Sequence, residues 1–360
     1  QLENASLKTS LLITLLAIVF TVALTYASVE LPSLLNTFLH NIIDFPGYDS
    51  SHEIHRTKTT SFIDSYYVRF IGYACLTIIV LLITVGFITK KSGLVSAGAI
   101  AIFLPVFGHF SFNMFFLAGL GAMRIIWMPM LDISYDILRL GDIAYLPYMI
   151  TVYLPALFKI DISTVIPYII MGSGVLIFIL GTQAWMFARF NKKGVATSWI
   201  YRFSRHPQYL GWIIWSYGLL IYLIRNSSLI HFKLTYEMPS SLPWLISSLV
   251  IICVALLEET KMKQKYPDEY EAYKQRAPFL FPIPKFISKI ITLPIKLLIK
   301  GEQPESVKEI VIIFFVYLGL LILLSVLFNA IDFLPRSGSV SYTHLTLPTT
   351  LPRCRSRWSP

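Results

Sequence analysis

Long apolar runs, separated by short polar and charged segments, make up most of this chain. A helix needs about 20 apolar residues to cross a hydrocarbon core of about 30 Å. Four runs come close to that length or exceed it, at residues 11–28, 68–89, 164–189 and 307–328. Two shorter runs, at 209–224 and 242–257, are also predicted to span a membrane.

The stretch from residue 94 to 158 supports two interpretations. It holds either one long span followed by an interfacial helix, or a hairpin of 94–108 and 111–130 followed by a third span at 143–158. Both interpretations give an odd number of spans in this stretch, so the segments after it lie on the same sides of the membrane in either case. We therefore predict an all-α integral membrane protein, a helical bundle of about seven to nine transmembrane helices.

Composition and charge support the membrane class. Hydrophobic residues make up 55% of the chain and charged residues 14%, whereas about 25% are charged in a typical soluble domain. The net charge of +10 is better explained by cytoplasmic loops and lipid headgroups than by nucleic acid. If successive spans alternate in direction, three basic segments lie on the same side of the membrane: Lys90 and Lys91, the loop 189–205 and the segment 261–308. Their positive charge predicts that this side is the cytoplasm.

Two segments near the C-terminus differ from the rest. Lysines recur at spacings of four, seven and four at Lys285, Lys289, Lys296 and Lys300. Apolar residues lie largely on another helical face, at Phe286, Ile290, Leu293 and Leu297. This predicts a basic amphipathic helix in the headgroup plane, with a kink or a division into two pieces at Pro294. The tail 337–360 resembles translated vector sequence, and we expect it to be non-native.

Polar residues gather where the two shorter spans meet their borders. Arg205, His206, Pro207 and Tyr209 open the first span, and Glu258-Glu259 closes the second. Consecutive spans joined by a short loop are antiparallel neighbours, so both groups are predicted to meet at the cytoplasmic border. Pro207 suits the first turn of a helix. Gly211 and Gly218 allow close approach of a helix or a ligand.

This cluster allows a structural and a functional interpretation. It could be an ion-pair network that holds the hairpin together. Polar groups at membrane depth, however, usually face a cavity, and the surrounding aromatic residues suit an adenine ring or a cation; they are Trp199, Tyr201, Tyr209, Trp212 and Trp215. Tyr266, Tyr270, Tyr273 and Arg276 follow, and we expect them to form a C-terminal lid over a cytoplasmic cofactor pocket.

The segments "RHPQYLG" and "EE…KYPDEYEAYKQRAPFLFP" resemble the isoprenylcysteine carboxyl methyltransferase and phospholipid methyltransferase superfamily over residues 191–284. The resemblance implies an integral membrane enzyme that uses S-adenosylmethionine. It differs at Trp199 and Pro267, where the family usually has glycine. It also leaves the N-terminal helices and the last span without a counterpart.

The resemblance implies a role for each matching residue. Cofactor binding is implied for Tyr201, Arg205, His206, Tyr209, Glu258 and Glu259. The chemistry adds two catalytic residues: Arg276, which would orient a carboxylate acceptor, and one of Glu258 and Glu259, of which Glu259 is assigned, as the base for an amine acceptor, since two adjacent carboxylates raise one pKa. Tyr270, Tyr273 and Trp212 are expected on the substrate side. The acceptor is expected to be hydrophobic or lipid-linked, an isoprenylcysteine carboxylate or a phospholipid amine, with membrane lipids as further partners and no nucleic acid.

The expected organisation has five parts. They are N-terminal transmembrane helices of unassigned role (1–163), a catalytic membrane domain (164–284), an interfacial segment (285–300), a final span (307–330) and the tail (337–360). Two other functions stay open, a sterol-reductase-like oxidoreductase that uses NADPH and a non-catalytic protein that retains the scaffold. No metal site is expected, because His52, Glu53 and His55 have no further ligand at a suitable spacing.

Overall fold

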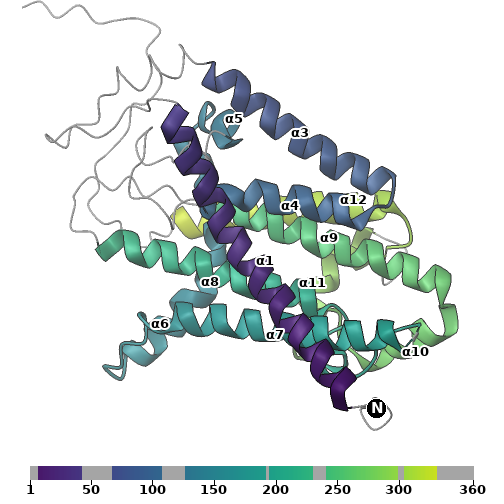
Figure 1. Ribbon diagram of the computed structural model, residues 1–360. Coiled ribbons are helices and arrows are strands. Elements are labelled where there is room, and N and C mark those ends of the chain that lie inside the picture. The colour runs from purple at the N-terminus through teal and green to yellow at the C-terminus, as the bar shows by residue number, and fades with distance from the viewer. Residues whose placement is uncertain are drawn as a thin grey trace, which may run out of the picture.

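The computed structural model describes residues 7–42, 67–107, 126–191, 194–229, 241–298 and 304–330. Every regular element in these ranges is a helix (Figure 1). The longer helices are α1 (Leu7–Ile42), α3 (Val68–Ile88), α4 (Ser92–Phe107), α6 (Leu146–Ala156), α7 (Ile166–Phe190), α8 (Pro207–Leu229), α9 (Ser241–Lys265), α10 (Pro267–Arg276), α11 (Lys285–Leu298) and α12 (Val307–Ala330). Short turns are α5 (Met128–Leu131), η3 (Tyr135–Arg139), η4 (Asp142–Tyr145) and η5 (Trp199–Arg202).

The six apolar runs predicted as spans all form helices. Five helices among the described residues are long and apolar enough to cross a membrane, namely those at Lys8–Ser28, Val68–Ile88, Ile166–Phe190, Ser241–Lys265 and Val307–Ala330. The chain is therefore an integral membrane protein. In the ambiguous stretch, α4 is followed by the short turns α5, η3 and η4 and then by the short helix α6. Residues 108–125, which include most of the second half of the predicted hairpin (111–130), lie outside the described residues. The total number of spans stays a prediction.

Helices α7 and α8 pack closely along their length because glycines lie at their contact. A Cβ added at Gly211 would lie 2.6 Å from the backbone nitrogen of Phe178, and one at Gly174 would lie 2.4 Å from that of Trp215. Gly218 is similarly close to Met171. Gly211 and Gly218 thus allow a neighbouring helix to approach closely, which confirms one of the two roles expected of them. The approach of a ligand stays a prediction.

Helix α9 occupies the centre of the bundle. Of its apolar stretch, 72% is buried, compared with 17–22% for the other four candidate spans. It packs against α4, α8 and α12, and the Ser247 hydroxyl donates to the Ala99 carbonyl at 2.7 Å. At its start, Ser241 Oγ lies 2.6 Å from the carboxylate of buried Asp142. These contacts fix the position of α9 and hence of the glutamates at its other end.

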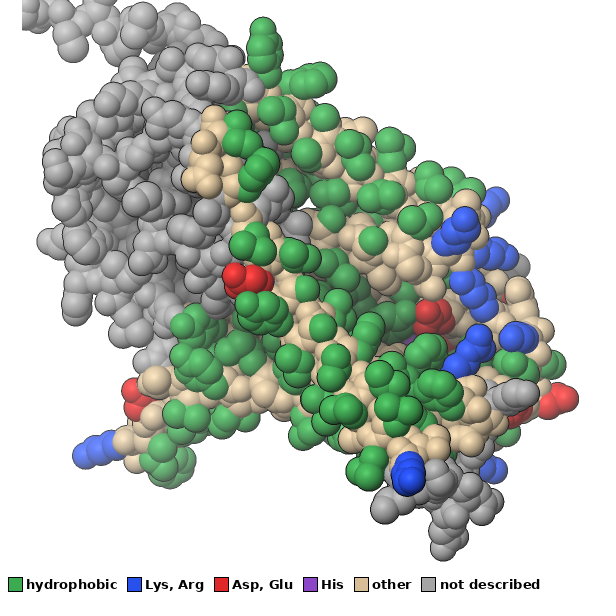
Figure 2. All heavy atoms as spheres, in the orientation of Figure 1, with side chains coloured by type: hydrophobic (Ala, Val, Ile, Leu, Met, Phe, Trp, Pro, Cys, Tyr) green, Lys and Arg blue, Asp and Glu red, His purple; other side chains and the backbone are tan. Residues whose placement is uncertain are grey.

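Lysine and arginine side chains gather at one end of the molecule. Figure 2 shows most of those in view on the right, where α3 and α9 end and α10 lies, while hydrophobic side chains cover the adjoining face. The predicted basic loops after the spans 68–89 and 242–257 thus lie at the same end. Their assignment to the cytoplasm stays a prediction.

Helix α11 has the predicted amphipathic pattern. Large apolar side chains are exposed on it at Phe286, Ile290, Leu293 and Leu297. Ile295 packs toward α12 instead, and the Tyr317 hydroxyl of α12 donates to the carbonyl of Ile291. Pro294 lies inside one continuous helix. The alternative of two short pieces was wrong, because the loss of one hydrogen bond at proline does not end a helix that is supported by packing.

Candidate functional site

The start of α8 is held by backbone contacts on both sides. Pro207 occupies its first turn, where a missing N–H costs nothing. The backbone N–H of His206 donates to Ser204 Oγ at 3.2 Å. The backbone N–H of Arg205 donates to the carbonyl of Pro278 at 3.0 Å. The segment after α10 therefore folds back onto the start of α8, and both are fixed relative to each other.

Arg205, His206 and Glu259 form a buried charged cluster between α8 and α9. Arg205 Nε lies 2.8 Å from Glu259 Oε1, and His206 Nε2 lies 3.2 Å from the same oxygen. Arg205 is 8% exposed and Glu259 is 5% exposed. Arg205 Nη1 also donates to the Lys274 carbonyl at 3.3 Å. The two polar borders meet, as the topology predicted.

Glu258 has a different environment from its neighbour. Successive residues on a helix point about 100° apart, so Glu258 faces Tyr209, whose hydroxyl donates to Glu258 Oε1 at 2.7 Å. Glu258 is only partly buried. Helix α9 does not end at the glutamates but continues to Lys265. The apolar run ends at the glutamates, but the helix continues beyond them because charged residues with strong helix propensity follow.

Three tyrosines form a wall beside the charged cluster. Tyr201, Tyr270 and Tyr273 are buried together, and the Tyr273 hydroxyl donates to the Tyr201 carbonyl at 2.8 Å. The pKa of each of these three tyrosines lies above its ordinary value, and burial is the main cause. They are therefore neutral at physiological pH and act as hydrogen-bonding groups. Helix α10 thus packs against the site, and its role as a lid over a cofactor pocket stays a prediction.

The aromatic ring of Phe279 was not singled out in the sequence. Its centroid lies 5.3 Å from that of His206, edge to face, and 5.8 Å from Arg205 Cζ. A cation near an aromatic face gains electrostatic stabilisation. The motif "RAPFLFP" contains this residue, but nothing in its spacing distinguishes Phe279 from Phe281, which is exposed.

Two predicted site residues lie away from the charged cluster. Trp212 is buried in the core with Trp215, at a ring separation of 4.9 Å. Arg276 is exposed at the end of α10, and no ion pair joins it to the cluster among the described residues. Their predicted roles toward a substrate stay predictions.

The cluster has polar atoms suited to a zwitterionic ligand. Arg205 Nε lies 2.8 Å from Glu259 Oε1, and the Tyr270 hydroxyl interacts with the same carboxylate, so both could exchange this partner for a charged ligand. Glu258 uses one carboxylate oxygen for Tyr209, so the other can accept from an ammonium group or a hydroxyl. The described residues contain no group of three metal-ligating side chains.

No curated protein and no solved structure matches the chain. A family model does match part of it, from the second half of α7 through η5 and α8. That part contains Tyr201, Arg205, His206 and Tyr209, whereas Glu258 and Glu259 lie beyond it. Residues 175–238 match the model of the isoprenylcysteine carboxyl methyltransferase family, which confirms the resemblance that the Arg-His-Pro element indicated.

Proposed function

We propose that this chain is an S-adenosylmethionine-dependent membrane methyltransferase that acts on a hydrophobic or lipid-linked acceptor. The observation that carries the proposal is the meeting of Arg205 and His206 with Glu259 at the end of two packed helices. The match of residues 175–238 to a methyltransferase family includes one side of this cluster.

The cofactor would be held by groups of opposite charge. Its amino-acid part is a zwitterion, and Glu258 is suited to the ammonium group because one of its oxygens is not engaged by Tyr209. Arg205 and His206 are suited to the carboxylate. Tyr201 and Tyr270 offer aromatic surface for the adenine. When bound, the cofactor supplies a sulfonium methyl group for in-line displacement.

The protein's own task is mainly to position the acceptor and to exclude water. A carboxylate acceptor, as in an isoprenylcysteine, needs no proton transfer before it attacks. A phospholipid amine must lose a proton. Glu258 is better placed than Glu259 to accept that proton, because Glu259 already lies against Arg205 and His206. Burial of the tyrosine wall keeps water from this side of the cluster.

Calorimetric titration of the purified protein in detergent tests the cofactor. S-adenosylhomocysteine is titrated, and NADPH serves as the comparison because a reductase would bind it. We expect binding of S-adenosylhomocysteine alone, and at least tenfold weaker binding by Glu258→Gln, about the effect of losing one charged hydrogen bond. Glu305→Gln, at the exposed Lys263–Glu305 pair, is the control and should bind as the parent does.

Transfer of a radiolabelled methyl group then tests the acceptor. Farnesyl cysteine with a free carboxylate and phosphatidylethanolamine are offered separately in mixed micelles. Labelling of either one identifies the acceptor class. Binding of NADPH in place of S-adenosylhomocysteine would overturn the proposal and favour the oxidoreductase.

A further inference from the structure

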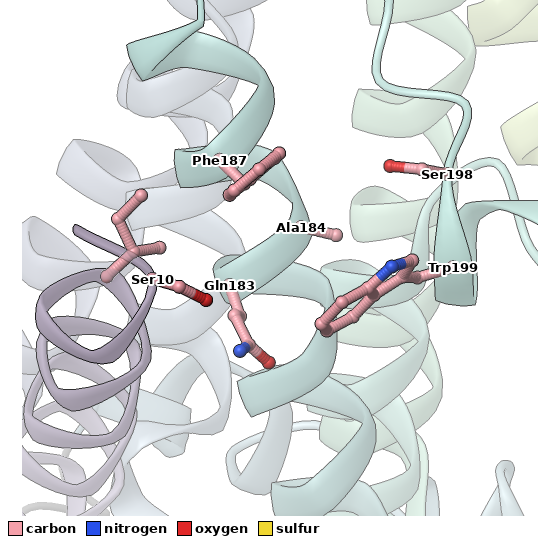
Figure 3. Close-up of a pocket in the computed structure, with 7 residues that line it drawn as sticks. Ser10, Gln183, Ala184, Phe187, Ser198 and Trp199 are labelled. Atoms are coloured by element: carbon pink, nitrogen blue, oxygen red, sulfur yellow. The ribbon is translucent and has the colours of Figure 1, made fainter. Parts of the chain in front are cut away.

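The protein is closely packed where the tyrosine wall meets α7. Ala184 of α7 packs with Tyr201 and Tyr270, and in Figure 3 the Trp199 indole points toward this helix. The hollow that Ala184 and Trp199 help to line has room for about one water molecule, so it does not hold a larger ligand. Another border of the charged cluster is more open. It is formed by the segment 277–284, whose second half is exposed.

The segment 277–284 contacts the charged cluster in two ways. The carbonyl of Pro278 accepts the backbone N–H of Arg205 at 3.0 Å. The Phe279 ring lies against His206 and near the Arg205 guanidinium. An apolar ring in this position keeps water from the charges, and charge interactions strengthen as the surroundings become less polar. The strength with which the cluster holds a charged ligand therefore depends on where Phe279 lies.

The same segment is a stiff connection between the cluster and α11. It contains Pro278, Pro282 and Pro284, and proline fixes its own φ and restricts the residue before it. The carbonyl of Pro284 accepts the backbone N–H of Ser288 at 3.0 Å, in the first turn of α11. Few backbone angles can therefore absorb a movement of α11, and Phe279 follows such a movement.

Helix α11 is only lightly held by the rest of the protein. None of its described side chains is fully buried. Ile295 packs against the second half of α9 and the start of α12, as Phe279 does. The carbonyl of Ile291 accepts a hydrogen bond from Tyr317 of α12. Since α9 and α12 are candidate membrane spans, α11 lies beside the bilayer.

One face of α11 is apolar and exposed, with lysine next to it in the sequence. Phe286, Ile290 and Leu297 are 66%, 68% and 77% exposed, and Lys289 is also exposed. An apolar face of this kind requires a hydrophobic partner, and the lysines require an anionic one. A surface of anionic phospholipid supplies both.

We propose that α11 docks on anionic phospholipid at the membrane surface and that docking holds Phe279 against Arg205 and His206, so that anionic lipid increases the affinity for the cofactor. The proposal rests on the proposed function. In the docked state Phe279 shields the charges, as in the structure. Without the surface, α11 moves, the stiff segment carries Phe279 away, and water competes for the cluster. Two separate sites are thus coupled, the lipid-facing side of α11 and the cofactor site.

Calorimetric titration in nanodiscs of two compositions tests the coupling. S-adenosylhomocysteine is titrated into the full chain in phosphatidylcholine alone and in an equal mixture of phosphatidylcholine and phosphatidylglycerol. We expect binding at least about fivefold tighter in the mixture. Lys289→Glu on α11 should reduce this ratio. Lys91→Glu makes the same change of charge at the end of α3, where basic side chains also gather, and should leave the ratio as in the parent.

The role of Phe279 is tested by the same ratio, which a merely structural role would not change. Phe279→Leu keeps an apolar side chain but removes the ring, and it should bind weakly in both lipids, with a ratio near one. Phe279→Tyr keeps the ring and should restore the ratio. Phe281→Leu, at an exposed position of the same segment, is the control and should behave as the parent does. A parent-like ratio in Phe279→Leu would refute the coupling through this ring.

The outcomes separate this proposal from the proposed function. Equal affinity of the parent in both lipids, or equal effects of Lys289→Glu and Lys91→Glu, would overturn the coupling and leave the methyltransferase standing. A parent that binds no S-adenosylhomocysteine in either lipid would refute both. Retention of phosphatidylglycerol by Lys289→Glu and Lys91→Glu, measured by native mass spectrometry, then decides whether α11 docks on lipid at all.

Discussion

Removal of the Glu259 carboxylate should destabilise the protein strongly, because it leaves Arg205 buried without a counter-charge. The two side chains lie 2.8 Å apart and each is 6% exposed. Loss of one partner from a buried ion pair costs about 3–5 kcal/mol, and His206 loses the same acceptor at 3.2 Å. We expect Glu259→Ala to lower the free energy of unfolding by about that amount. Unfolding in mixed micelles of rising SDS fraction, followed by tryptophan fluorescence, measures it.

The exposed pair Lys263–Glu305 provides the matched control. Its atoms are 3.0 Å apart, but its side chains are 53% and 74% exposed, so Glu305→Ala should cost less than about 1 kcal/mol. Replacing both buried partners, in Arg205→Met with Glu259→Leu, should restore most of the stability, because no uncompensated charge is left. Equal losses for Glu259→Ala and Glu305→Ala would refute the argument that burial determines the effect.

Further predictions concern the rest of the site and the bundle. Tyr209→Phe removes the donor to Glu258 and should cost about 1.5 kcal/mol in the same assay, with weaker binding of S-adenosylhomocysteine; unchanged values in both would exclude this hydrogen bond from the site. Gly211→Ala forces a Cβ against the backbone of α7 and should cost about 1–3 kcal/mol, whereas Gly172→Ala, with open space around it, should stabilise the helix by about 0.5–1 kcal/mol. Lys289→Glu on α11 should weaken retention of anionic lipid by about 1 kcal/mol or more, measured by native mass spectrometry of nanodiscs; equal retention would mean that α11 does not contact headgroups.

Topology and motif chemistry were enough to predict where the two polar borders meet. Alternating spans put the start of 209–224 and the end of 242–257 on one side, and the structure confirms this in the Arg205–Glu259 contact. The glycines at 211 and 218 were predictable for a similar reason, since small residues at helical spacing permit close contact. Both features depend on the order of the chain and on residue size, which a sequence contains.

The different partners of Glu258 and Glu259 could not be predicted in the same way. It depends on the rotation of α9 about its axis, which is fixed by contacts far from the motif, such as that of Ser247 with α4. The aromatic contact of Phe279 depends on how the chain folds back after α10. The packing of α1 against α7, where the Gln183 amide donates to Thr14 Oγ1, is likewise encoded by no local pattern.

A role in stabilising the fold does not by itself explain the buried charged cluster. A buried pair such as Arg205 and Glu259 is seldom more stabilising than apolar residues of similar volume, because both charges lose their hydration. Helix α9 is already fixed along its length by apolar packing, and Ser241 and Asp142 hold its other end. A charged cluster is therefore not needed to hold the bundle together. Its desolvation cost is better explained by a charged ligand that exchanges partners with Arg205, His206 and the two glutamates, as the methyltransferase proposal requires.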